Sequence, residues 1–364
     1  MALLQEGQDI RGAYTVERFL GEGAFAEVYR VRHRFLGRQA MKVFKLGMSV
    51  QETEQMLSEA IILSRISHPN IIHVFDADVT ETARGTCGFF TMEYIAGGSL
   101  DQFWKSHGSR FIPVETVVEI MRQVCRGLAV AHGDDPPIIH RDIKPQNILI
   151  GYDSAGVRAR VSDFGLAKHV NPLTLMASAR GTRCFKAPEV FRDPSSDSRA
   201  GDVWALGMTM YLLLTDRLPF ATDRDDNIDP RMFEQRVTPP SRWNIGIDGA
   251  LDAIAFRSLN PNSEERYPTA MEMLEALDQW KPQGAKTPNQ KFSSSSKLSV
   301  EFDGGPSPNE QEGKRLAAEA LRLAQQITTL SEAADTMEEA FNRWPETRLQ
   351  HEHQVKLWRR GIMM

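Results

Sequence analysis

The sequence predicts an α+β protein of two lobes, followed by a flexible linker and a small helical tail. Strand-like segments separated by turns fill residues 14–93, whereas helical periodicity dominates residues 114–280. At residues 281–311 the composition changes, and aliphatic side chains give way to serine, proline, glycine and lysine. These three observations fix the order of the parts, from a β-rich lobe to a helical one and then to an appendage.

The first lobe, residues 14–93, alternates β-favouring segments with turns. A helical pattern at residues 49–66 interrupts the strands, with Glu59 on the same face as its apolar residues. Ala96, Gly97 and Gly98 then form a natural hinge, because glycine relaxes the backbone between two lobes. Strands are expected at residues 14–20, 27–33, 38–44 and 89–93.

The second lobe, residues 97–280, is expected to be mainly helical. One strand pair is predicted at residues 148–150 and 160–162, on either side of a turn near residues 153–156. The longest apolar run, at residues 208–214, is far too short to cross a bilayer and indicates a buried core helix.

The linker, residues 281–311, holds four lysines, four prolines, three glycines and the serine run 293–296, and such a segment cannot bury enough apolar surface to fold. The tail, residues 312–360, returns to a helical pattern. A capping box is expected at Thr329 and Glu332, and a last helix should end at Arg359 and Arg360, before Gly361. Two apolar stripes are expected: Leu316, Ala320, Leu323 and Ile327, then Ala333, Met337, Ala340, Phe341 and Trp344.

Composition narrows the class of protein. A chain of 364 residues with 41% hydrophobic residues can bury a sizeable core, and a net charge of −5 gives no reason to expect nucleic acid as a partner. Three cysteines, Cys87, Cys125 and Cys184, are too few for a disulfide framework and favour a reducing compartment. The first twelve residues lack the pattern of a signal peptide. A cytoplasmic protein is therefore expected.

A glycine-rich turn, with Gly21 and Gly23, lies between the first two expected strands. Glycine lets backbone N–H groups approach phosphate oxygens closely, although an ordinary hairpin turn would use the same residues. A strand follows the turn, whereas a dinucleotide-binding fold would place a helix there. Ala26 occupies a position where a third glycine is usual in phosphate-binding loops of this kind.

Lys42 has apolar neighbours in its strand, and Glu59 lies among apolar residues on its helix. A buried charge is costly unless it is paired. We therefore expect Lys42 and Glu59 to form an ion pair that leaves the lysine able to hold phosphate groups. The alternative is that both side chains are simply solvated.

The segment from His140 to Asn147 carries most of the predicted chemistry. Asp142 is placed to accept a hydroxyl proton, and Lys144 to neutralise a phosphoryl group in transfer. Asn147 and Asp163 offer hard oxygen ligands that suit Mg²⁺. His140 and Phe164 are expected to pack in the core rather than to react.

Together these motifs resemble the eukaryotic-type serine/threonine protein kinases, and most of all their bacterial members, over residues 14–280. The resemblance implies a bilobal kinase fold, ATP and Mg²⁺ as cofactors, and protein substrates, among which the chain itself is expected. It also implies that Asp202 braces the catalytic loop and that Arg266 pairs with Glu189 of Ala187-Pro188-Glu189. Lys144 and Gly181-Thr182 match the serine/threonine pattern. The ATP-binding residues implied are Gly21, Gly23, Val28, Ala40, Lys42, Met92, Glu93, Ile95 and Leu149, with Met92 gating the back of the pocket.

Arg141 precedes the proposed base, and a cation at this position is typically balanced by a phosphorylated residue in the activation segment. Thr174 and Ser178 are the two candidates, and Thr182 closes the segment. The alternative is that Thr174 and Ser178 are ordinary loop residues.

Two other functions fit parts of the sequence. A pseudokinase scaffold is disfavoured because Lys42, Asp142, Asn147 and Asp163 are all present. A small-molecule phosphotransferase is disfavoured because such enzymes generally lack an Ala-Pro-Glu segment.

The tail is expected to bind a partner protein or a second copy of the chain, because short apolar helices are marginal without packing partners. Regulation of the catalytic domain is the alternative role for the tail.

Overall fold

The computed structural model describes residues 2–23, 26–45, 64–108, 110–164, 183–193, 195–220, 232–233, 235–282 and 308–363. The predicted helix at residues 49–66 lies almost wholly outside these ranges, as do Glu59, Thr174, Ser178 and Thr182.

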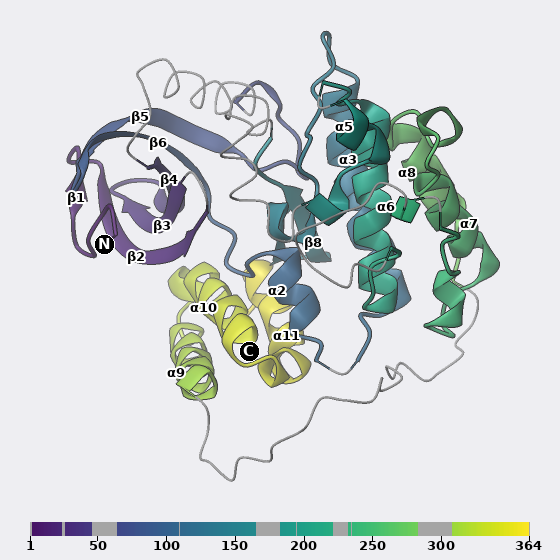
Figure 1. The fold of residues 1–364 in the computed structure, drawn as a ribbon. Coiled ribbons are helices and arrows are strands. Elements are labelled where there is room, and N and C mark those ends of the chain that lie inside the picture. Colours follow the sequence, from purple (N-terminus) through teal and green to yellow (C-terminus); the bar gives the residue numbers. More distant parts are fainter. Residues whose placement is uncertain are drawn as a thin grey trace.

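The first lobe is built on a six-stranded antiparallel sheet with the order β1-β2-β3-β4-β6-β5 (Figure 1). Its strands are β1 (Asp9–Ile10), β2 (Tyr14–Glu22), β3 (Ala26–His33), β4 (Gly37–Phe44), β5 (Val74–Thr82) and β6 (Gly85–Glu93). The sequence analysis missed β1 and β5. β5 is an edge strand with the sequence VFDADVTET, whose acidic residues lower its strand propensity and remain largely exposed.

Alternation along β4 separates two cores. Met41 and Val43 pack on one face of the sheet with Leu3 and Tyr29 from the N-terminal part of the chain. Ala40 and Phe44 belong to the main core, on the opposite face. Because successive side chains of a strand point to opposite faces, Lys42 shares its face with Ala40 and Phe44. The lysine therefore faces the interior of the molecule.

The second lobe is helical, as predicted. Its helices are α2 (Leu100–Lys105), α3 (Val114–His132), α5 (Pro188–Arg192), α6 (Arg199–Thr215), α7 (Gly249–Ser258) and α8 (Ala270–Gln279). The short 3₁₀ turns are η1 (Pro145–Asn147), η3 (Arg183–Phe185), η5 (Pro240–Arg242) and η6 (Ser263–Glu265). Helix α6 is buried along nearly its whole length, because it carries the apolar run that the sequence analysis assigned to the core.

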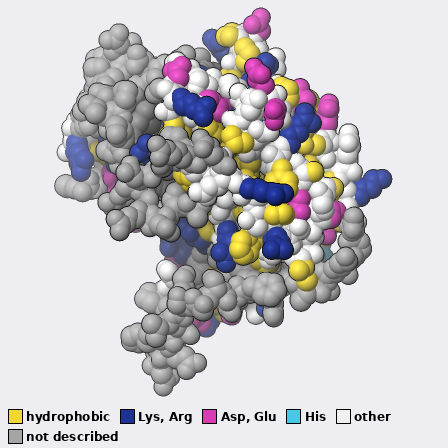
Figure 2. All heavy atoms as spheres, turned by 45° about the vertical axis from the view of Figure 1, so that its right-hand side comes forward, with side chains coloured by type: hydrophobic (Ala, Val, Ile, Leu, Met, Phe, Trp, Pro, Cys, Tyr) yellow, Lys and Arg dark blue, Asp and Glu magenta, His cyan; other side chains and the backbone are white. Residues whose placement is uncertain are grey.

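The predicted strand pair forms the hairpin of β7 (Ile148–Asp153) and β8 (Gly156–Val161), which is longer than expected. On the face in Figure 2, basic and acidic side chains are interspersed, in keeping with the small net charge. Within the described part of the chain, no helix is both long and apolar enough to span a bilayer.

The tail forms α9 (Pro308–Leu323), η7 (Ile327–Thr329), α10 (Leu330–Arg343) and α11 (Glu346–Arg359). Although α9 follows α8 in the sequence, Figure 1 shows the tail helices beside α2 and the first-lobe sheet, away from α7 and α8. Helix α9 begins inside the stretch that was predicted to be linker. Gly361, with φ of +73°, follows α11 as predicted.

Two further details of the tail prediction are wrong. Thr329 makes no capping bond at α10, because its hydroxyl donates to the carbonyls of Leu323 and Gln326 at the end of the preceding turn. Ile327 is 67% exposed, since η7 turns it away from the stripe to which it was assigned. The second stripe is buried at Ala333, Met337, Ala340 and Phe341.

The tail core is not confined to the tail. Tyr152 of the β7–β8 hairpin belongs to the same apolar cluster, and its ring meets Phe341 edge to face at 6.1 Å between centroids. Val157, from the other strand of the hairpin, also packs against this cluster. The apolar face that was expected to bind a partner is thus largely covered within the chain.

Candidate active site

A cleft of about 550 Å³ lies between the first-lobe sheet, the hinge and the β7–β8 hairpin. Most of the ATP-binding residues expected from the sequence line it: Gly21, Val28, Ala40, Met92, Glu93, Ile95 and Leu149. Lys42 reaches the cleft through its contact with Asp163, which is part of the lining. The structure therefore gathers at one cleft residues that are far apart in the sequence.

The glycine-rich turn joins β2 to β3. Gly21 pairs with Val28 across the two strands, and the Gly23 N–H donates to the Ala26 carbonyl at 2.8 Å. Residues 24 and 25 lie outside the described residues. Ala26 is a strand residue buried in the main core, so the alanine at this position serves the packing of the lobe.

Lys42 binds Asp163, with 2.7 Å between its Nζ and Oδ1 of the carboxylate. The lysine side chain is only 6% exposed, so an opposite charge beside it is required. Burial would raise the pKa of Asp163, but the charge and hydrogen bond of Lys42 outweigh it and lower that pKa. The expected partner, Glu59, lies outside the described residues, and Asp163 is a partner of Lys42 among the residues that are described.

Asp142 is held by the two residues predicted to work with it. Lys144 Nζ lies 2.8 Å from Oδ2 of Asp142, and Asn147 Nδ2 donates to the same oxygen at 2.9 Å. Asn147 also donates to the Asp142 backbone carbonyl at 2.8 Å. Pro145 starts the 3₁₀ turn that brings Asn147 back toward Asp142. These contacts fix the orientation of the carboxylate.

Two residues near this loop have left-handed backbones. Arg141 has φ of +71° and Asp163 has φ of +62°, a region that side-chain-bearing residues rarely adopt. Such strain persists only where surrounding contacts impose it, and it is concentrated at functional sites.

Asp202 of α6 supplies the contacts that hold the loop at Arg141. Its carboxylate accepts hydrogen bonds from the N–H groups of His140 and Arg141, both at 2.8 Å, and from His132 Nε2 at 3.0 Å. His132 was not identified from the sequence. Its Nδ1 accepts from the Ala270 N–H at 3.2 Å, which leaves Nε2 as the proton-bearing nitrogen that donates to Asp202.

His140 is fully buried and packs 4.5 Å from the ring of Phe164, between centroids. Its Nδ1 accepts from the Asp142 N–H at 3.2 Å, so Nε2 donates to the Ser162 carbonyl at 2.8 Å. Burial lowers the pKa of His140, which keeps the ring neutral. His140 and Phe164 thus both pack, as the sequence analysis expected.

Arg141 has an acidic partner that the sequence analysis missed. Its Nε lies 3.1 Å from Oδ2 of Asp197, and Lys186 Nζ donates to its backbone carbonyl at 2.6 Å. The phosphorylated residue expected to balance Arg141 falls outside the described residues.

Glu189 and Arg266 form a bidentate pair, with both N···O distances at 2.7 Å. Arg266 is 1% exposed, and its guanidinium also lies 4.9 Å from the centre of the Trp204 ring. Such fork-to-fork geometry fixes orientation as well as charge. The pair connects the Ala187-Pro188-Glu189 segment to the loop before α8, as the resemblance implied.

The hinge side of the cleft holds an ion pair and three tail residues that the sequence analysis did not predict. Glu93 forms an ion pair with Arg160 of β8, at 2.9 Å between Oε2 and Nε, and burial raises the pKa of Glu93. Glu339, Asn342 and Arg343 of α10 also line the cleft. Because they lie so far from the hinge in the sequence, no local pattern could have revealed them.

Comparisons with known proteins identify the family of the chain. A family model described as the protein kinase domain matches residues 14–280. Serine/threonine-protein kinase PknB of Mycobacterium leprae is 33% identical over 266 residues, which cover 71% of this chain and 42% of that protein. A probable serine/threonine-protein kinase of Clostridium perfringens is 29% identical over 295 residues, covering 80% of this chain and 41% of that protein. The chain therefore aligns with less than half the length of these curated relatives.

A solved structure shows the same fold. The crystal structure of the Mycobacterium tuberculosis PknI kinase domain superimposes with a TM-score of 0.56 and 26% sequence identity. The match covers 76% of this chain and 99% of that one. Because the family model spans well over half of the sequence, the chain belongs to the protein kinase family, with the eukaryotic-type serine/threonine kinases of bacteria as its relatives.

Proposed function

We propose that this protein transfers the γ-phosphoryl group of ATP to serine and threonine hydroxyls of proteins. The observation that carries the proposal is the Asp142 carboxylate, which Lys144 and Asn147 hold beside a cleft that also contains the Lys42–Asp163 pair. Serine/threonine specificity rests on Lys144, on Thr182 and on the names of the relatives. The chain itself is expected to be one substrate, because its linker holds the serine run 293–296 and its activation segment contains Thr174 and Ser178.

In this reaction the substrate hydroxyl gives its proton to Asp142 as its oxygen bonds to the γ-phosphorus. The bond from that phosphorus to the β–γ bridging oxygen breaks, and ADP leaves. Lys144, 2.8 Å from Asp142, is close enough to neutralise charge on the phosphoryl group during transfer. Lys42 lies at the cleft to position the phosphates of ATP.

The donor set fits Mg²⁺. The amide nitrogen of Asn147 donates its hydrogen bonds to Asp142, so its Oδ1 is the side-chain atom left to bind a cation. Oδ1 of Asp163 binds Lys42, and Oδ2 is the second carboxylate oxygen at the cleft. Amide and carboxylate oxygens are ligands that Mg²⁺ prefers. When bound, the ion would neutralise charge on the β- and γ-phosphates.

The roles and boundaries assigned from the sequence are part of the proposal. Residues 14–280 are the catalytic domain, and the protein acts in the cytoplasm. The predicted linker, 281–311, is shortened to 281–307, and the tail, predicted as 312–360, begins at 308, because α9 starts there. Thr174 or Ser178 is the phosphorylated residue that balances Arg141. Association of the tail with a partner or a second copy would have to use exposed residues such as Leu349, because Met337 and Phe341 are buried in the chain.

The proposal is tested by incubating the full chain with radiolabelled ATP, Mg²⁺ and a generic protein substrate. Acid hydrolysis should yield phosphoserine or phosphothreonine. Asp142→Asn should lower turnover by about 10²- to 10⁴-fold while nucleotide binding stays intact, the usual range for a positioned general base.

The matched control is Asp153→Asn, at a carboxylate of the β7–β8 hairpin that binds Arg158 outside the cleft. It should leave turnover nearly unchanged. Phosphotyrosine as the sole product would contradict the substrate class. An inactive wild-type chain that still binds ATP would favour the pseudokinase alternative.

A further inference from the structure

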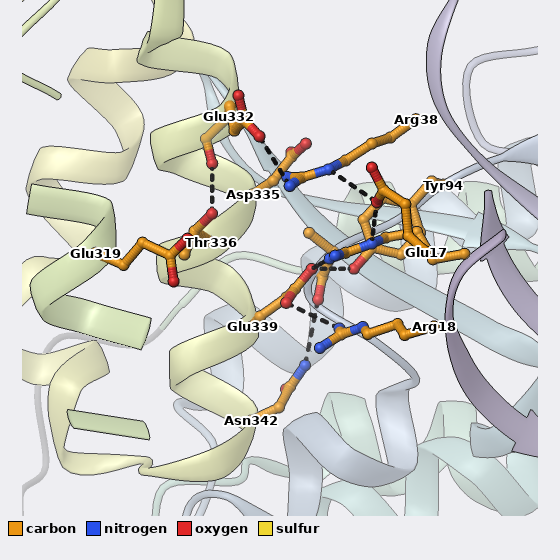
Figure 3. Close-up of polar contacts among 12 residues, drawn as sticks. Glu17, Arg18, Arg38, Tyr94, Glu319, Glu332, Asp335, Thr336, Glu339 and Asn342 are labelled. Carbon is orange, nitrogen blue, oxygen red and sulfur yellow. Dashed lines mark hydrogen bonds and ion pairs between the residues drawn. The ribbon is translucent and has the colours of Figure 1, made fainter. Parts of the chain in front are cut away.

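The acidic face of α10 lies against an arginine-rich face of the first-lobe sheet (Figure 3). Glu332 binds Arg38 of β4 at 2.8 Å and Arg32 of β3 at 3.4 Å. About two helical turns further along α10, Glu339 binds arginines nearer the hinge. The helix and the sheet therefore have complementary charge along the length of their contact.

Glu339 is the best-connected of these acidic residues. Its Oε2 lies 2.8 Å from Arg18 Nη2, and its Oε1 lies 2.5 Å from Arg30 Nη1. The Tyr94 hydroxyl donates to Oε1 as well. The Glu339 side chain is only 6% exposed, so these contacts are little screened by solvent. We call Arg18, Arg30, Tyr94 and Glu339 the hinge–tail network.

The hinge–tail network connects two walls of the cleft. Arg18 belongs to β2, the strand that leads into Gly21 of the glycine-rich turn. Tyr94 lies between Glu93 and Ile95, and all three line the cleft. Burial and the Glu339 carboxylate both raise the pKa of Tyr94, so its hydroxyl stays a donor. The Glu339 carboxylate thereby connects β2, the strand that contains Gly21 and is called the glycine strand below, to the hinge.

The hinge is shaped to let α10 approach. Asn342 Nδ2 donates to the Ala96 carbonyl at 3.4 Å. A Cβ on Gly98 would lie 2.2 Å from Gln102 Oε1 and 2.9 Å from the same nitrogen of Asn342, and this glycine also has φ of +71°. Glycine at this position therefore serves both the turn and the contact with the tail.

The other side of the tail is attached to the second lobe. Arg348 of α11 donates to the Ser106 hydroxyl at 2.5 Å, and its guanidinium lies 4.4 Å from the centre of the Phe103 ring. Arg360 donates to the Ser154 carbonyl at 2.9 Å. The tail thus contacts both lobes and the hinge between them.

We propose that α10 is a structural wall of the nucleotide site and that Glu339 is a positioning residue for nucleotide binding. This inference rests on the proposed function, because it deepens the role of the same cleft. Glu339 acts through Arg18 and Tyr94, which hold the glycine strand and the hinge at the separation that admits the nucleotide. Docking of the tail and binding of the nucleotide are then coupled, and each strengthens the other.

The test measures the dissociation constant of a fluorescent ADP analogue with Mg²⁺ on the full chain. Glu339→Gln keeps the size of the side chain and removes the charge. It should raise the dissociation constant by roughly 5- to 150-fold, the usual range for coupled sites. In the kinase assay, KM for ATP should rise more than kcat falls. Glu339→Asp, which keeps the charge, should recover part of the affinity.

Glu332→Gln is the matched control. Glu332 lies on the same face of α10 as Glu339 and also pairs with two arginines, Arg32 and Arg38 of the sheet. Unlike Glu339, it does not line the cleft. Glu332→Gln should leave nucleotide affinity within about twofold of the wild type, well below the coupling range. Asn342→Ala is a second variant, for the case in which Glu339→Gln fails to fold, because it leaves no buried charge unpaired. It should raise the dissociation constant by a smaller factor than Glu339→Gln.

Unchanged affinity in both Glu339→Gln and Asn342→Ala would overturn the proposal. An equal loss of nucleotide affinity in Glu332→Gln would also overturn it, because the effect would then come from docking of the tail in general. Tighter nucleotide binding in Glu339→Gln would overturn it as well, because the tail would then compete with the nucleotide. Because binding is measured without phosphoryl transfer, failure of the proposed activity would leave this comparison of affinities intact.

Discussion

Asp202 and Glu339 are both buried carboxylates with three donors, but their donors differ in kind. Asp202 accepts from two backbone N–H groups and a neutral histidine, all within the second lobe. Glu339 accepts from two arginines and a tyrosine, which belong to β2, β3 and the hinge. Donors that all lie within one lobe fix a local conformation. Donors from separate segments, two of them cationic, hold those segments together.

The two regions should therefore respond differently to loss of the carboxylate. Asp202→Ala leaves three buried donors without a partner, at a cost of about 1–3 kcal/mol for each unsatisfied group. It should lower the free energy of unfolding of the second lobe by about 3 kcal/mol or more and abolish turnover. Urea unfolding followed by tryptophan fluorescence measures this change.

Glu339→Ala is the comparison variant for Asp202→Ala. Its main effect should be release of the tail, seen as faster hydrogen exchange in α9 to α11, with the second lobe nearly as stable as before. If Glu339→Ala destabilised the second lobe as much as Asp202→Ala, the distinction between a local and a connecting carboxylate would be wrong.

Removal of the tail should have an intermediate effect. A chain that ends at Pro282 should fold, because the linker composition marks a domain boundary. It uncovers Tyr152, whose burial contributes roughly 1.5–3 kcal/mol. The melting temperature should fall by several degrees, since each 1 kcal/mol corresponds to about 2–4 °C in a domain of this size.

A second substitution sharpens that measurement. Tyr152→Ser should destabilise the full chain but should be nearly neutral in the truncated one, where the side chain is already uncovered. An insoluble truncated chain, with or without Tyr152→Ser, would instead make the tail an obligatory part of the core.

The smallest expected effect is that of pH on the docking of the tail. Glu338 of α10 is fully buried, and burial raises its pKa from 4.5 to about 7, although Arg359 at 2.7 Å opposes the shift. A raised pKa means that the folded state favours the protonated acid. The contribution of Glu338 to docking of the tail is therefore complete below pH 4.5 and is lost as pH rises through about 7.

Hydrogen exchange in α10 and α11, measured at pH values on both sides of that pKa and corrected for the intrinsic rate, should show weaker protection at the higher pH. Glu338→Gln should remove this dependence, whereas Glu332→Gln, at a partly exposed position, should leave it in place. Protection that increased with pH would show that the Arg359 pair outweighs burial.

The sequence by itself determined the parts whose chemistry is local. Asp142, Lys144 and Asn147 belong to one short segment, so their spacing already placed them in a single loop. The apolar residues of β4 and the apolar run of α6 indicated the strand and the buried helix for the same reason. Edge strand β5 was missed because its acidic residues face solvent.

Tertiary structure decided the contacts between distant segments. Pairing of Lys42 with Asp163 and of Arg141 with Asp197 depends on where the lobes and loops meet. The same holds for the tail, whose apolar stripes were evident but whose partner was not. The sequence of an amphipathic helix shows that one face must be buried, but it does not show which part of the protein buries it. Only the fold showed that the β7–β8 hairpin covers the apolar side of the tail and that the hinge–tail network lies on the acidic side of α10.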